Sequence, residues 1–106
     1  MTPRRRDPGL DDLIADITVD CYNEDEELTG FESAFDEWAV LPCPGTVIGE
    51  DVQVLSVATQ RGRRELVATC ERDGRKYQIA LLDIELEADP ATERLLAAYR
   101  WWAECR

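Results

Sequence analysis

The chain has 106 residues, with 12 Lys and Arg against 23 Asp and Glu and a net charge of −11. This length is enough for one domain with a modest core and too short for two. No apolar run reaches the roughly 18 residues of a membrane-spanning helix, and the basic opening Arg4-Arg5-Arg6 lacks the apolar stretch of a signal peptide. We expect a cytoplasmic protein with a flexible tail over residues 1–9 and one domain over residues 10–106.

Charge is unevenly distributed along the chain. Fourteen acidic residues and no Lys or Arg lie between Asp7 and Gln60, whereas six basic and three acidic residues lie between Arg61 and Ala80. An acidic surface repels phosphate backbones and attracts cations or basic proteins. The sequence therefore predicts no nucleic-acid partner, and the absence of an apolar span predicts no membrane partner.

The residue types that most enzymes use are poorly represented. The sequence has no histidine, which is the commonest general base and the commonest nitrogen ligand of transition metals. It also has no Gly-rich phosphate loop. The spacing of its cysteines is poor for a zinc site, so we expect reduced, half-buried thiols at Cys21, Cys43, Cys70 and Cys105. A non-enzymatic protein is expected.

Apolar residues recur at helical spacing in two segments before residue 40. A first helix over residues 10–19, with Pro8-Gly9 as its lower limit, is predicted from the stripe Leu10, Leu13, Ile14 and Ile17. A second helix begins within residues 23–27 and presents Leu28, Phe31, Phe35 and Trp38. Gly30 either interrupts this helix or marks its start.

The sequence after residue 40 favours short β-strands. Leu41-Pro42-Cys43-Pro44-Gly45 has the chemistry of a turn or an edge, since proline cannot donate to a sheet ladder. Short strands are predicted at residues 46–48, 52–57, 66–70 and 77–81, and Asp73-Gly74 predicts a tight hairpin between the last two.

A final helix starts at Asp89, a natural N-cap, followed by Pro90 at the first helical position. Its core face is predicted to be Leu95, Leu96, Tyr99, Trp102 and Ala103. The predicted fold class is α+β: two N-terminal helices, a small antiparallel SH3-like β-barrel or bent sheet, and a C-terminal helix.

The acidic run before the second helix is the strongest functional signal. Most residues from Asp20 to Glu27 are polar or ionised, and no Lys or Arg lies nearby in the sequence. Crowded carboxylates raise one another's proton affinity or recruit a counter-charge. Calcium prefers about six to eight oxygen ligands in a tolerant geometry, whereas magnesium demands a tighter octahedron. The run therefore predicts a hard divalent cation, with calcium favoured.

An EF-hand is a poor explanation of this run. Counting from Asp25 puts Gly30 at the sixth loop position and Asp36 at the twelfth. Glu32 then occupies the eighth position, where an apolar residue is needed, and Asp36 is one methylene shorter than the usual bidentate Glu.

The order of these motifs resembles a known family. The segment from Ile17 to Phe31, followed by Phe35-Asp36-Glu37, is similar to the opening of the CcbP-type calcium-binding proteins, which are small, acidic and bacterial. Leu41-Pro42-Cys43-Pro44 resembles the family's entry to its β-region. Tyr99-Arg100-Trp101-Trp102 resembles its closing helix.

The resemblance implies calcium binding through acidic side chains without EF-hands. The matching acidic positions are Asp20, Glu24, Glu26, Asp36 and Glu37, with Asn23 and Asp25 as additional oxygen donors. Glu27 stands where a longer polar or basic residue is expected, Glu32-Ser33-Ala34 replaces an aromatic run, and the closing aromatic cluster lacks its His.

Three alternatives to a calcium buffer or weak sensor remain open at this level. Basic side chains after Gln60 can neutralise the acidic run across the fold as salt bridges. The acidic face can instead dock a basic partner protein without metal. Paired carboxylates can also act in glycoside hydrolysis, for which this chain is small.

Overall fold

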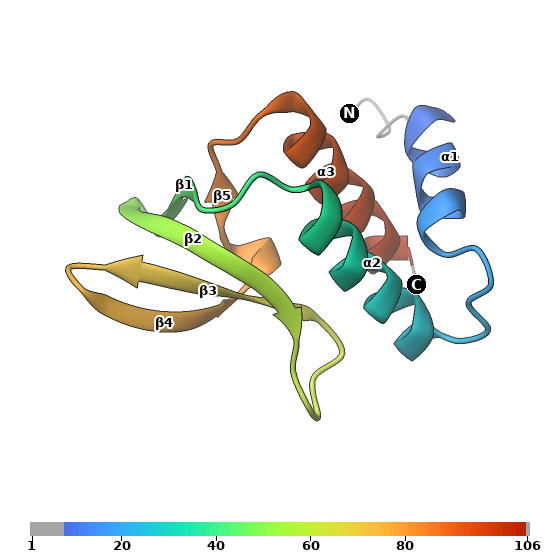
Figure 1. Ribbon diagram of the computed structural model, residues 1–106, viewed down its shortest axis with the longest axis horizontal. Coiled ribbons are helices and arrows are strands. Elements are labelled where there is room, and N and C mark those ends of the chain that lie inside the picture. The colour runs from blue at the N-terminus through green and yellow to red at the C-terminus, as the bar shows by residue number, and fades with distance from the viewer. Residues whose placement is uncertain (1–7, 106) are drawn as a thin grey trace, which may run out of the picture.

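The computed structural model describes residues 8–105 and shows, within them, three α-helices and a five-stranded antiparallel sheet (Figure 1). The helices are α1 (Pro8–Ile17), α2 (Glu24–Trp38) and α3 (Pro90–Cys105), and a short 3-10 helix, η1, covers Leu81–Asp83. The strands are β1 (Cys43–Val47), β2 (Glu50–Thr59), β3 (Leu66–Arg72), β4 (Arg75–Ala80) and β5 (Glu85–Leu86). The α+β class is confirmed, with a bent, open sheet in place of a closed barrel.

The sheet has the strand order β4-β3-β2-β1-β5. Two-residue turns join β1 to β2 and β3 to β4, and both residues of each turn have positive φ, which is the type I′ geometry that suits tight hairpins. Asp73-Gly74 forms the second turn, as predicted. Ile48-Gly49 forms the first, so the prediction that Ile48 continues a strand is wrong.

Proline 44 lies inside β1, where the sequence predicts a turn or an edge. The Glu87 N–H donates to the Pro44 carbonyl at 2.9 Å, on the side away from β2. In an antiparallel strand the nitrogen and the oxygen of one residue point to the same side. The missing N–H of Pro44 therefore faces away from β2 and removes no hydrogen bond from the β1–β2 ladder.

The helices form a layer on one side of the sheet, in which α2 and α3 lie between the sheet and α1 (Figure 1). In this layer α2 contacts β2 and α3, and α1 packs on α3 and α2. Residue Gly30 permits the α1–α2 contact, because a Cβ atom there would lie 2.8 Å from the Ile17 carbonyl oxygen. This close approach explains a glycine inside an unbroken helix, where it costs about 1 kcal/mol relative to alanine.

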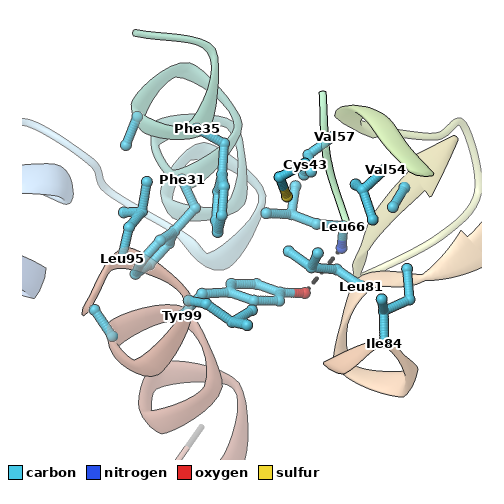
Figure 2. Packing of buried hydrophobic residues seen from close by; sticks show 14 of the residues in the cluster. Phe31, Phe35, Cys43, Val54, Val57, Leu66, Leu81, Ile84, Leu95 and Tyr99 are labelled. Atoms are coloured by element: carbon cyan, nitrogen blue, oxygen red, sulfur yellow. Dashed lines mark hydrogen bonds between the residues drawn. The ribbon is translucent and has the colours of Figure 1, made fainter. Parts of the chain in front are cut away.

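The core fills the space between the helical layer and the sheet (Figure 2). Phe31 from α2 meets Tyr99 edge-on at 5.5 Å and Trp102 at 5.2 Å between ring centroids. The Leu66 N–H at the start of β3 donates to the Tyr99 hydroxyl at 2.8 Å, so the buried phenol has a partner (Figure 2). Burying a large apolar side chain of this kind stabilises a fold by about 1.5–3 kcal/mol.

Most of the predicted core face is buried, including Leu28, Phe31, Phe35, Leu95, Leu96, Tyr99 and Trp102. Leu10, Leu13, Ile14 and Ala103 are half-buried against the core, and Trp38, the last residue of α2, is 49% exposed. Asp89 caps α3 as predicted, since its Oδ2 accepts from the Thr92 N–H at 3.2 Å.

Cysteines 21, 43 and 70 carry free thiols; the side chains of Cys43 and Cys70 are buried, and that of Cys21 is half-buried. The predicted tail over residues 1–9 falls mainly outside the described residues, and α1 begins at Pro8. No helix between residues 8 and 105 combines the length and the apolar character needed to cross a bilayer.

Candidate functional site

The acidic run predicted as a cation site lies at the junction between α1 and α2. After α1 ends at Ile17, the chain turns through Asp20, which adopts the left-handed conformation at φ 65°. Val19 and Asp20 in this turn are exposed, Cys21 is half-buried, and Tyr22 is 88% exposed. The junction is therefore open to solvent on the side that carries the carboxylates.

Two of the predicted site residues form the cap of α2. The Asn23 side-chain oxygen accepts from the Glu26 N–H at 2.9 Å, as an N-cap residue does. The Glu26 carboxylate reaches back and accepts from the Tyr22 N–H at 2.7 Å. This reciprocal arrangement is close to a capping box, and it gives both side chains a role in the fold without metal.

The first turn of α2 carries four consecutive acids, Glu24, Asp25, Glu26 and Glu27. The unpaired N–H groups at a helix N-terminus favour negative charge there, typically by about 0.3–1 kcal/mol per residue. Glu27 has a further partner, because its Oε2 accepts from the Trp102 indole N–H at 2.8 Å. The helix therefore offsets part of the repulsion in the acidic run.

The pKa of the Cys21 thiol reflects the negative charge of the junction. This pKa is raised, first by burial of the thiol and then by the charges of Glu26, Glu27 and Asp20. A thiolate here would face three carboxylates, so the neutral thiol is favoured. Each of these three carboxylates thus disfavours a negative charge on the Cys21 thiol.

The length of α2 separates two of the predicted ligands from the others. Asp36 and Glu37 lie near the C-terminal end of this continuous helix, about 18 Å along its axis from Glu24 at a rise of 1.5 Å per residue. Ligands of one calcium ion lie about 2.3–2.6 Å from it, so these two residues do not share an ion with the junction. The positions from Asp25 to Asp36 are helical, and no EF-hand loop forms there.

The donor atoms suit a hard cation, but the side chains do not converge on one point. Carboxylate and amide oxygens predominate at the junction, which matches the preference of calcium. Within residues 8–105, no three Asp, Glu or Cys side chains are placed to hold a metal ion together. Asp20, Asn23, Glu24, Asp25 and Glu26 are exposed, so their side chains have room to reorient.

A second acidic region, which the sequence analysis did not single out, lies at the far end of the sheet. A hollow of about 860 Å³ there has five acidic residues in its lining, Glu50, Asp51, Glu71, Asp73 and Glu87. Arg72 also lines it and forms ion pairs with Glu50 and Asp73. These acids are spread along the sequence, and the pairing of β2 with β3 and of β1 with β5 brings them together.

Glu32 shows how the fold uses another acid of α2. Its carboxylate accepts from both the N–H and the hydroxyl of Thr59 and so joins α2 to the end of β2. The same position departs from the aromatic pattern expected by resemblance. The carboxylate here connects two elements and is unrelated to the junction.

Comparison with solved structures identifies proteins of the same fold. The crystal structure of Anabaena CcbP matches with a TM-score of 0.82 and 23% identity, over 97% of this chain and 95% of that protein. A calcium-binding protein in its calcium-binding form matches with a TM-score of 0.80 and 21% identity, over 99% of this chain and 97% of the other. The resemblance to CcbP-type proteins is therefore confirmed at the level of the fold.

Comparisons of sequence alone are negative. No model of a known protein family matches the chain, and no curated protein matches it. The likeness is carried by the tertiary structure across nearly the whole length of both chains.

Proposed function

We propose that this protein binds calcium at the α1–α2 junction and acts as a buffer or weak sensor without catalysing a reaction. The single observation that supports this best is the shared fold with a calcium-binding protein in its calcium-binding form, a fold that Anabaena CcbP also has. The proposed ligands are oxygens of Asp20, Asn23, Glu24, Asp25 and Glu26. Asp36 and Glu37, at the other end of α2, would form a separate and weaker group.

The chemistry of the junction supports a hard cation. Several carboxylates lie within one turn of helix, and the charges of Glu26, Glu27 and Asp20 each contribute to the raised pKa of the Cys21 thiol. Bound calcium would supply the positive charge that no Lys or Arg supplies nearby in the sequence. Because Glu26 and Asn23 also cap α2, binding would couple the ion to the start of this helix.

The proposal is tested by calorimetric titration with calcium, with magnesium as the control ion, and by thermal melting. Calcium at a hundredfold excess over its Kd should stabilise the fold by about 2.7 kcal/mol. Magnesium should have a smaller effect, because it requires a stricter octahedron. Absence of both heat and stabilisation with calcium would refute the proposed function.

Two matched double variants test where calcium binds. Asp20→Asn with Glu24→Gln removes two charges at the junction and should weaken calcium binding strongly. Asp51→Asn with Glu71→Gln removes two charges from the hollow at the sheet end and should leave binding unchanged. Weakened binding in the sheet-end variant, with unchanged binding in the junction variant, would mean that calcium binds at the sheet end.

The thiol of Cys21 gives a second, local measurement. A cation beside Asp20 and Glu26 would oppose the charges that raise the pKa of Cys21, so the pKa would fall. The rate of alkylation of Cys21 at fixed pH should then increase with calcium. A Cys21→Ser variant establishes that the signal comes from this thiol, and an unchanged rate would exclude calcium from the junction.

Docking of a basic partner by the same acidic face is the competing function. It predicts salt-sensitive association with a basic protein and no response to calcium. The titration described above separates the two, because a metal-independent docking face gives no calcium heat.

A further inference from the structure

Strand β4 forms an open edge of the sheet. It is the last strand in the order β4-β3-β2-β1-β5, and none of the described residues pairs with its outer side (Figure 1). The opposite edge is formed by β5, which has two residues, whereas β4 has six. A long unpaired edge is a template for another strand.

The register of the β3–β4 hairpin identifies the backbone groups on this edge. The two-residue turn makes Arg72 and Arg75 a hydrogen-bonded pair, and such pairs alternate along an antiparallel ladder. Backbone groups of Tyr77 therefore point towards β3, and those of Lys76 and Gln78 point away from the sheet. These outward N–H and C=O groups are available to a further strand.

The side chains of β4 differ between its two faces. Tyr77 and Ile79 lie on the face that carries the core residues of β3, yet Tyr77 is 46% exposed. Beside Tyr77 lies a hollow of about 410 Å³ lined also by Arg72, Asp73 and Arg75. Lys76 and Gln78 lie on the other face and are exposed. An incoming strand would thus meet an apolar face and a polar face.

Strand β4 itself carries Arg75 and Lys76 and no acidic residue, although the protein as a whole is acidic. Among the residues that the structure describes, Arg63 and Arg72 form ion pairs with acids, whereas Arg75 and Lys76 form none. Lys on an edge strand is also a common protection against aggregation. A half-exposed tyrosine beside a hollow works against such protection, because it offers apolar surface to an incoming strand.

We propose that the outer edge of β4 docks an extended acidic segment of a partner protein as a sixth strand. Carboxylates of that segment would face Lys76, and its apolar side chains would lie against Tyr77. Backbone groups of Lys76 and Gln78 would form the new ladder. This site lies apart from the α1–α2 junction, and the proposal holds whether or not the chain binds calcium.

The test uses a peptide of about eight residues in which Glu alternates with Val, a length that spans an ordinary strand. Its control replaces each Glu with Lys. In NMR titrations, the Glu peptide should shift the amide signals of Lys76 and Gln78 and slow their exchange with solvent. The Lys peptide should leave these signals unchanged, because it meets like charge at Lys76.

Two variants at one position test the ladder itself. Gln78→Pro removes an outward N–H while keeping the hydrogen bonds to β3, as proline on an edge strand does. It should raise the Kd of the Glu peptide about tenfold, the change that corresponds to one lost backbone hydrogen bond. Gln78→Ala keeps the N–H and should bind as the unmodified protein does, and a melting curve verifies that both variants fold.

Three results would overturn the proposal. The first is equal binding of the Glu and Lys peptides. The second is equal affinity of Gln78→Pro and Gln78→Ala. The third is concentration-dependent shifts of Lys76 and Gln78 without peptide, which would assign the edge to a second copy of this chain.

Discussion

The α1–α2 junction and the far end of the sheet are both rich in carboxylates, but they neutralise them differently. At the junction, the Tyr22 N–H donates to the Glu26 carboxylate, and the Trp102 indole N–H donates to that of Glu27. At the sheet end, Arg72 pairs directly with Glu50 and Asp73. The count of acids is therefore a poor guide to a cation site, because the partner of each acid decides how much negative charge is left.

The two regions also differ in how firmly they are attached to the core. The first turn of α2 is joined to α3 by Glu27, and Phe31 one turn later is fully buried. The hairpin between β3 and β4 is exposed throughout its turn. Substitutions in the two regions should therefore change the stability by different amounts and even in opposite directions.

Truncation of a buried and an exposed aromatic residue should show the largest difference. Phe31→Ala removes a ring that contacts Tyr99 and Trp102 and should cost about 3–5 kcal/mol of stability. Tyr77→Ala, at the edge of the sheet, should change it by less than about 1 kcal/mol. Urea denaturation measures both, and similar losses would show that the hairpin is as firmly packed as the junction.

Gly30→Ala should be the next largest effect. The added methyl group would lie 2.8 Å from the Ile17 carbonyl oxygen, so α1 and α2 would have to separate. We expect a loss of about 1–3 kcal/mol, although alanine normally favours a helix. Ser33→Ala, on an exposed position of the same helix, should instead be neutral or slightly stabilising. A gain from Gly30→Ala would mean that the α1–α2 contact is loose.

A substitution in the turn between β1 and β2 should increase the stability of the protein. Ile48 is β-branched, 97% exposed and held at φ 50°, where such residues are strained. Ile48→Asn would create the favoured Asn-Gly turn and should raise stability by about 1 kcal/mol. The control Val40→Asn replaces another exposed aliphatic residue without positive φ, and equal gains would attribute the effect to surface polarity.

The smallest effect that we expect is on the stability of the protein at acidic pH. The pKa of Asp89 is lowered, first by the hydrogen bond from the Thr92 side chain, so the folded state favours the ionised carboxylate. Its contribution is complete above the ordinary pKa near 4 and is lost as the pH falls through the lowered value. Thr92→Val should flatten the fall of the denaturation midpoint below pH 4, whereas Thr92→Ser keeps the hydroxyl and the slope. An unchanged slope in Thr92→Val would contradict this assignment.

Patterns that join residues close in sequence predicted much of this protein. The spacing of Leu28, Phe31 and Phe35 determines the buried face of α2, and Asp89 with Pro90 determines the start of α3. The Asp73-Gly74 turn was predicted for the same reason, since helix periodicity, caps and hairpin turns act over a few residues.

Only the tertiary structure decided the features that depend on distant segments. It placed Gly30 against Ile17, directed the nitrogen of Pro44 away from β2, and separated Asp36 and Glu37 from the junction along an unbroken helix. It also brought Arg72 to Glu50, and Trp102 to Glu27. Close approach of backbones and the pairing of charges are set by chain segments far apart in sequence, which no local pattern encodes.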